Sequence, residues 1–180
     1  MVLGIDKVLE LVKNENLVEN LTDRELNDPE GTGLDLSVGK VSKFVKSTAY
    51  LGVEHRSTLD TEIIATFDAN SNKQIILKPQ EYLLVTTYEV INMPNNLVGI
   101  IRPRGTLFRS GIFLSTGQVN PGYKGELTFG MYNCSPFEFT FELRSRIAHI
   151  LFSEIDGQSV EYRGQWNGGR ISAPSLEQQI

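Results

Sequence analysis

From Leu34 onward the sequence is a succession of short apolar runs, and this spacing restricts the fold more than any other feature. The runs are LDLSVGKV, EIIATFD, KQIILK, YLLVTTYEVI, LVGIIRP, GIFLST, GELTFGMYN, FEFTFEL and IAHILFSEI. Turn residues separate many of them, at Asn70-Ser71-Asn72, Lys78-Pro79, Pro94-Asn95-Asn96, Pro121-Gly122 and Ser135-Pro136. Many short strands at close spacing predict an all-β barrel or sandwich.

The residues before Leu34 have a different pattern of apolar and polar side chains. Apolar side chains recur at helical spacing between Ile5 and about Lys13, which predicts one short amphipathic helix. The polar stretch LTDRELNDPEGTG, residues 21–33, indicates a loop or a short helix that enters a loop. A length of 180 residues favours a single domain. We expect a helical and loop extension over 1–33, a β-barrel over 34–160 and a flexible C-terminal arm over 161–180.

Composition and charge exclude several kinds of partner. A net charge of -5 argues against a general nucleic-acid-binding face, which needs to be basic. The single cysteine, Cys134, excludes an intrachain disulfide framework and a cysteine-based zinc site. The sequence has no apolar run near the ~18 residues of a membrane span, and its N-terminus lacks the pattern of a secretory signal. We therefore expect a cytoplasmic protein that binds neither nucleic acid nor membrane.

Several enzyme classes lack their motifs. The sequence has no glycine-rich phosphate loop that ends in Lys-Ser or Lys-Thr, and no Gly-x-Ser-x-Gly nucleophile turn. A zinc nucleobase deaminase needs more cysteines than this chain contains. No protein ligands for a metal ion are predicted.

Three arginines lie around a Gly-Thr turn in the stretch IIRPRGTLFRSG, directly after an apolar strand. Arginine side chains match the geometry of phosphate oxygens, and Gly105 would let backbone N–H groups approach an anion. Thr106 adds a hydroxyl group. The stretch therefore indicates a phosphate-binding site, with a solvated strand end carrying surface arginines as the alternative.

The stretch STGQVNPGYKGELTFGMYN, from Ser115 to Asn133, predicts a strand, a tight turn and a second strand. The loop at Thr116 and Gly117 can present backbone groups to the edge of a nucleobase. Tyr123 can stack under a ring. The alternative is a plain hairpin whose tyrosine covers its own turn.

Three further features have both a functional and a structural interpretation. Asp35, between two leucines, is either a site residue or a solvent-facing strand residue. His149 lies in an apolar strand, where a lone histidine is more often a core or interface residue than a catalyst. The tail after Tyr162 contains the exposed-looking Trp166 and a Gly-Gly pair, so it is either a lid over a ligand or a mobile tail.

Taken in order, five stretches resemble the motifs of the trimeric dUTPase and dCTP deaminase superfamily: GLDLSVG, RPRGTLFRSG, STGQVNPGYKGELTFGMYN, RSRIAHILF and YRGQWNGGR. The resemblance implies a distorted jelly-roll β-barrel and a homotrimer with three sites at subunit interfaces. It also implies a deoxynucleoside triphosphate ligand, dUTP or dCTP, with Mg²⁺ bound mainly through its phosphates.

The resemblance also implies roles for individual residues. Phosphates would be contacted by Arg104, Gly105, Thr106 and Arg109. The pyrimidine would be read by the backbone of Ser115, Thr116 and Gly117, and Tyr123 would lie against the deoxyribose. His149 stands beside the nucleotide, where the family usually has Gln. The arm that closes over the triphosphate would contribute Tyr162, Gln165 and Trp166.

The chain departs from the superfamily at two catalytic positions. Asn120 stands where dUTPases have the Asp that holds the attacking water, and Gly130 stands where the deaminases have a proton-shuttling Glu. Because GQVNPGYKG resembles the dUTPase form of the motif, the first interpretation is dUTPase-like hydrolysis of dUTP to dUMP and pyrophosphate, with Asn120 as the catalytic candidate. A dCTP deaminase with a displaced catalytic acid is one alternative. The other is a nucleotide-binding protein with little or no catalysis and a regulatory role.

Overall fold

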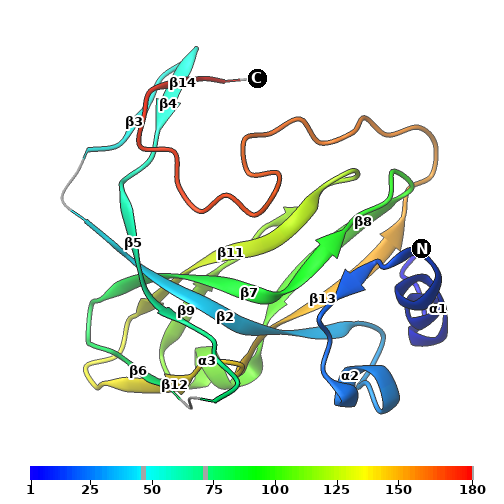
Figure 1. The fold of residues 1–180 in the computed structure, drawn as a ribbon, viewed down its shortest axis with the longest axis horizontal. Coiled ribbons are helices and arrows are strands. Elements are labelled where there is room, and N and C mark those ends of the chain that lie inside the picture. Colours follow the sequence, from blue (N-terminus) through cyan, green and yellow to red (C-terminus); the bar gives the residue numbers. More distant parts are fainter. Residues whose placement is uncertain (46–47, 71–72, 180) are drawn as a thin grey trace.

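The computed structural model describes residues 1–45, 48–70 and 73–179 and has one curled antiparallel sheet at its centre (Figure 1). Its strands run in the order β10-β8-β13-β2-β7-β11-β9, with β1 beside β7 and β5 beside β2. They are β1 (Val18–Glu19), β2 (Leu34–Phe44), β5 (Thr61–Thr66), β7 (Tyr82–Asn92), β8 (Leu97–Pro103), β9 (Ile112–Ser115), β10 (Gln118–Val119), β11 (Lys124–Asn133) and β13 (Arg146–Glu154). The sheet curls into a half-barrel, so the predicted all-β, dUTPase-like class is confirmed.

The remaining strands form two smaller sheets. The first pairs β6 (Gln74–Leu77) with β12 (Phe139–Glu142). The second has the order β14-β4-β3 and joins Tyr50–Leu51 (β3), His55–Ser57 (β4) and Glu177–Gln178 (β14). All nine apolar runs named from the sequence form strands. Of the five strands of two or three residues, only β10 falls in a predicted strand, the one before the Asn120 turn; β1, β3, β4 and β14 were not predicted, because such short segments have no readable alternation.

The described residues form three helices: α1 (Ile5–Glu15), α2 (Asp23–Asn27) and α3 (Gly105–Arg109). Helix α1 follows the predicted pattern, with Asp6 in its first turn, a buried Val8 and a left-handed Asn16 that ends it. Helix α2 begins at Thr22, whose hydroxyl accepts a hydrogen bond from the Glu25 N–H. Both N-terminal predictions are confirmed. None of the helices in the described part of the chain is long and apolar enough to cross a membrane.

The core is built largely from buried residues of the sheet strands, whose successive side chains point to opposite faces. On β11, Leu127, Phe129 and Met131 are buried among the core residues. Thr128 and Gly130 belong to the opposite face of the same strand.

The C-terminal arm, residues 161–180, was expected to carry an exposed tryptophan. Instead, its described part runs back across the molecule and ends in β14, which pairs with β4 (Figure 1). Trp166 is partly buried and packs against the hydrophobic core. The expectation of an exposed Trp166 was therefore wrong, because strand and turn residues distant in sequence provide an apolar surface for the indole. The predicted Asn70-Ser71-Asn72 turn lies partly outside the described residues, at 71 and 72.

Candidate functional site

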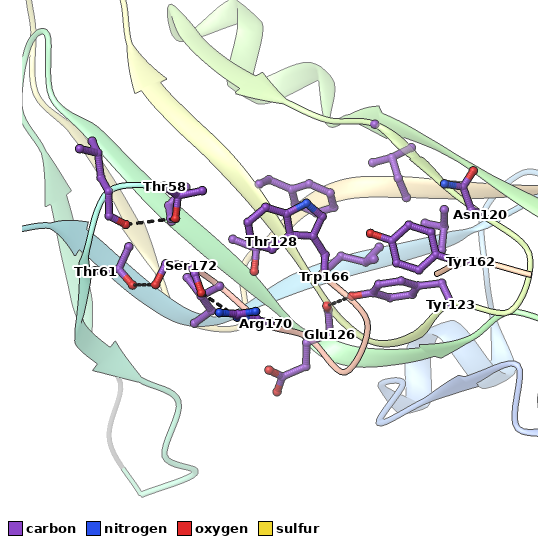
Figure 2. Close-up of a pocket in the computed structure, with 18 of the residues that line it drawn as sticks. Thr58, Thr61, Asn120, Tyr123, Glu126, Thr128, Tyr162, Trp166, Arg170 and Ser172 are labelled. Atoms are coloured by element: carbon purple, nitrogen blue, oxygen red, sulfur yellow. Dashed lines mark hydrogen bonds between the residues drawn. The ribbon is translucent and has the colours of Figure 1, made fainter. Parts of the chain in front are cut away.

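A pocket of about 610 Å³ lies between the turn after β10 and the C-terminal arm (Figure 2). Five of the residues predicted from sequence line it together: Gly117, Asn120, Tyr123, Tyr162 and Trp166. Its other walls come from β2, β5, β7 and β11 and include Phe44, Thr61, Leu84 and Thr128. The wall residues outside the motifs were missed, because nothing in their local sequence indicates that these strands meet.

The turn that borders the pocket is fixed by backbone hydrogen bonds to Met93. The Tyr123 N–H donates to the Asn120 carbonyl at 3.2 Å, and the Gly122 N–H donates to the Met93 carbonyl at 3.0 Å. Gly122 has a φ of 76°, which glycine adopts without strain. The tight turn is confirmed, but the strand before it pairs with β8 rather than with β11. The simple hairpin interpretation was therefore wrong, and the segment Ser115–Tyr123, here the turn segment, crosses between two strands of the sheet.

Three aromatic rings meet on one side of the pocket. The hydroxyl of Tyr123 donates to the Glu126 carbonyl at 2.5 Å, and its ring makes an edge contact with Tyr162 at a centroid distance of 5.6 Å. Burial, together with nearby Tyr162 and Glu126, raises the pKa of Tyr123 to about 12. Tyr123 is therefore a neutral wall residue near pH 7 rather than a base. Figure 2 shows Trp166 beside this pair of tyrosines.

The arm is held against the turn segment by its backbone. The Tyr162 N–H donates to the Pro121 carbonyl at 2.7 Å, and the Gly168 N–H donates to the Lys124 carbonyl at 2.6 Å. A Cβ on Gly125 would lie 2.4 Å from the Gly169 nitrogen, so the two backbones approach as closely as only glycine permits. The Gly-Gly pair of the arm therefore positions Tyr162 and Trp166 over the pocket.

The pocket has few charged groups. Among the described residues that line it, only Glu126 and Arg170 carry charge. The Glu126 carboxylate forms an ion pair with Lys40 at 2.5 Å and points away from the Trp166 indole (Figure 2). The Asn120 side-chain oxygen accepts a hydrogen bond from the Gln118 amide at 2.7 Å. The described wall thus offers amide, hydroxyl and aromatic groups, and its one carboxylate is already paired.

Gly130 is covered by a side chain from the neighbouring strand. A Cβ built on Gly130 would lie 1.7 Å from the hydroxyl oxygen of Tyr82 on β7. Tyr132 is the tyrosine nearest to Gly130 in the sequence, but Tyr82 is the residue that occupies this space. Tyr132 and Tyr82 are direct partners across β11 and β7, so either ring was a candidate, and only the structure shows which one leans over the glycine.

A second group of predicted residues gathers around Asp35, away from this pocket. Asp35 is 2% exposed, so the solvent-facing interpretation was wrong. One carboxylate oxygen lies 2.8 Å from Arg104 Nη1 and 2.8 Å from His149 Nδ1. The other lies 2.7 Å from Arg146 Nη1 and 3.7 Å from Arg24 Nη1. We call these five residues the Asp35 cluster.

The Asp35 cluster is arranged to keep its carboxylate ionised. Burial alone would raise the pKa of Asp35, but the His149 hydrogen bond and the charges of Arg104 and Arg146 lower it below its ordinary value. His149 is a satisfied partner of this carboxylate, as the structural interpretation expected. Arg24 and Arg146 were missed by sequence reasoning, because they join the cluster through α2 and the start of β13.

The remaining predicted residues lie on or near α3. Thr106 and Arg109 are exposed there, and the Arg109 guanidinium donates to the Gly105 carbonyl at 3.2 Å. Ser115 ends β9, and Thr116 lies next to it. Gln165 accepts a hydrogen bond from Arg56 beside the pocket. Within one chain, the arginines of the second motif therefore do not line the pocket that contains the turn segment and the arm.

The described residues contain no group of three or more His, Cys, Asp or Glu side chains placed to hold a metal ion. Asp35 is surrounded by arginines, and Glu126 is paired with Lys40. These carboxylates therefore do not fit a cation held by protein ligands. A divalent cation would instead be coordinated mainly by the phosphate oxygens of a bound nucleotide.

Comparison with known proteins identifies the family. The model of the dCTP deaminase-like family matches residues 2–155. The chain belongs to the dCTP deaminase-like family. The superfamily resemblance inferred from the five motifs is thereby confirmed.

Relatives within this family have substantial coverage at modest identity. The dCTP deaminase of Pyrococcus abyssi is 28% identical over 160 residues, which are 88% of this chain and 90% of that protein. A dUMP-forming dCTP deaminase of a Sulfurihydrogenibium species is 32% identical over 102 residues, 56% of this chain and 57% of that protein.

A solved structure supports the fold. The crystal structure of the dCTP deaminase of Agrobacterium tumefaciens aligns with a TM-score of 0.63 at 16% identity. The alignment covers 84% of this chain and 46% of that one, so this chain corresponds to about half of the Agrobacterium protein. At this identity, the similarity concerns the fold alone.

Proposed function

We propose that this dCTP deaminase-like chain binds a pyrimidine deoxynucleoside triphosphate in the pocket between the turn segment and the arm. The observation that carries the proposal is the set of aromatic walls, Tyr123, Tyr162 and Trp166, around a cavity of about 610 Å³. A flat heterocycle stacks well against such rings. The turn segment adds the backbone groups of Gly117 that can pair with the edge of a base.

Hydrolysis of dUTP to dUMP and pyrophosphate is the reaction that the Asn120 amide in the pocket wall favours. Asn120 can orient a water molecule through its amide, although it cannot take the proton. Loss of a general base commonly costs about 10²–10⁴ in rate, so turnover would be slow. A protein that binds the nucleotide with almost no turnover is the limiting case of this proposal.

Deamination of dCTP is disfavoured by Gly130 and Tyr82. Glycine carries no proton-transferring group, and the Tyr82 hydroxyl lies where a side chain at position 130 would begin. Glu126, the carboxylate that lines the pocket, is paired with Lys40. The names of the relatives favour this reaction, but these groups do not supply its acid and base.

The phosphates require cations that the pocket of a single chain does not offer apart from Arg170. The Arg104, Gly105, Thr106 and Arg109 segment would supply them if a second copy placed its α3 at the pocket. We therefore include in the proposal a cytoplasmic homotrimer whose sites lie between subunits. Mg²⁺ would arrive with the triphosphate and neutralise charge as the α-phosphate is attacked.

The test is a single incubation series. Purified protein is mixed with dUTP, dCTP or dTTP and Mg²⁺, and pyrophosphate, ammonia and heat of binding are measured. We expect binding of dUTP and dCTP, slow pyrophosphate release from dUTP and no ammonia. Rapid ammonia release from dCTP would contradict the preference for hydrolysis, and a lack of binding to all three nucleotides would contradict the proposal as a whole.

A further inference from the structure

Tyr82 is the first residue of β7, and its side chain lies over Gly130 of the neighbouring strand β11. Its hydroxyl oxygen would lie 1.7 Å, and its Cζ 2.5 Å, from a Cβ on Gly130. Real Cβ atoms essentially never approach another atom so closely, so the ring can lie across β11 only because position 130 is glycine. The glycine and the tyrosine therefore form one structural unit.

Two aromatic contacts hold the Tyr82 ring in place. It stacks on Phe44 of β2 with a centroid distance of 5.5 Å and an interplanar angle of 20°. Its ring centroid also lies 6.3 Å from that of Tyr132, its direct cross-strand partner on β11. Burial raises the pKa of Tyr82, so the phenol is protonated near neutral pH. The hydroxyl is therefore a neutral group on a stacked but 39% exposed ring, and it can both donate and accept a hydrogen bond.

The same ring stands beside the pocket. Phe44 lines the pocket, and so do Leu84 and Thr128, which lie two residues from Tyr82 and Gly130 on the same faces of β7 and β11. Within residues 1–45, 48–70 and 73–179, the Tyr82 hydroxyl has no hydrogen-bond partner. By contrast, the Tyr123 hydroxyl is engaged by the Glu126 carbonyl. Tyr82 itself does not line the pocket and is 39% exposed, so its hydroxyl is accessible beside the apolar wall, where it can orient a ligand that extends over Gly130.

We propose that Tyr82 is a positioning residue whose hydroxyl pairs with the polar edge of the bound pyrimidine. The inference rests on the proposed nucleotide-binding function of the pocket. Because a hydroxyl can donate to a carbonyl oxygen or accept from an amino group, Tyr82 serves a uracil edge and a cytosine edge alike. The pocket then binds dUTP and dCTP with affinities within about tenfold of each other, and Tyr82 contributes to both.

The test compares Tyr82→Phe with the parent, because phenylalanine keeps the ring and its stacking but removes the hydroxyl. Tyr132→Phe is the matched control, since it removes the hydroxyl of the direct cross-strand partner of Tyr82 in the same aromatic group. Binding of dUTP, of dCTP and of inorganic tripolyphosphate is measured by calorimetry with Mg²⁺, alongside thermal unfolding. We expect Tyr82→Phe to weaken both nucleotides about two- to tenfold, with tripolyphosphate binding and thermal stability unchanged.

The outcomes separate this inference from the function on which it rests. A parent protein that binds neither nucleotide overturns the proposed function and, with it, the role of Tyr82. A parent that binds both while Tyr82→Phe binds them equally well overturns the role of Tyr82 alone. An equal loss in Tyr82→Phe and Tyr132→Phe, or a loss that extends to tripolyphosphate, also overturns it, because both indicate a general change in the aromatic group.

Discussion

Gly130 shows how one residue can determine both stability and chemistry. It is buried, and Tyr82 covers the space into which any side chain would grow. We expect Gly130→Ala to lower the free energy of unfolding by about 1–3 kcal/mol, because the ring must leave its stack on Phe44. Urea unfolding measures the change. Gly117→Ala is the control, since a Cβ there meets nothing within 4 Å, and an equal loss in both variants would contradict the explanation.

Asn120 is the second residue whose replacement is informative. We expect Asn120→Asp to raise dUTP hydrolysis by at least about tenfold, because a carboxylate can take the proton of the attacking water while an amide cannot. The Gln118 amide that now donates to Asn120 can donate equally to an aspartate. Pyrophosphate release is the measurement. An unchanged rate, in a variant that still binds dUTP, would mean that the site holds the nucleotide in a geometry unsuited to hydrolysis.

At the scale of elements, the Asp35 cluster joins α2, β2, β13 and the N-cap residue of α3 through one buried carboxylate. We expect Asp35→Asn to destabilise the fold by about 3 kcal/mol at pH 7, because it leaves three arginines without their shared counter-charge. The folded-state pKa of Asp35 is below its ordinary value of 3.8, so its contribution is present above pH 3.8 and is lost as the pH falls toward the folded-state pKa. The difference between parent and variant should shrink in that acidic range.

Urea unfolding between pH 3 and pH 7 measures this difference. Asp156→Asn is a suitable control, because Asp156 is exposed and should behave like the parent. A difference that stays constant through the acidic range would show that Asp35 acts through packing rather than charge.

Glu89 on β7 has a pKa shift in the opposite direction to that of Asp35, so its effect on stability has the opposite pH dependence. It is 1% exposed, and its oxygens accept hydrogen bonds from the Ser37 N–H and hydroxyl, each at 2.7 Å. Burial raises the pKa of Glu89 despite these bonds and Arg144, so the folded state favours the protonated acid. Stability should therefore fall as the pH rises from 4.5 to the folded-state pKa. We expect Glu89→Gln to remove this fall in the urea profile, and a variant that keeps it would contradict the assignment.

The sequence predicts the long elements well, because their signals are local. The apolar runs of β7 and β11 and the helical spacing of α1 are readable within a dozen residues. The pairing of β10 with β8 is not readable, because it depends on how the turn at Asn120–Tyr123 is bonded to Met93. Likewise, the motifs name Tyr123, Tyr162 and Trp166, but the sequence does not show that Tyr82 rather than Tyr132 covers Gly130.

At the scale of the whole molecule, the two halves of the predicted site lie apart within a single chain. The turn segment and the arm border the pocket, whereas Thr106 and Arg109 lie on α3 and do not line it. We expect sedimentation at micromolar concentration to give a species of three times the 20.1 kDa chain mass, because a neighbouring copy is needed to bring the arginines to the phosphates. A stable species of 20.1 kDa that binds dUTP or dCTP would contradict a shared site.

Trp166 is the only tryptophan of the chain, and it lies in the pocket wall. Its intrinsic fluorescence therefore reports on this pocket alone, without interference from a second indole elsewhere. A nucleobase that stacks on the indole would quench the emission, and undocking of the arm would shift the emission to longer wavelength as water reaches the ring. A simple titration, without any label, thus distinguishes occupation of the pocket from release of the arm.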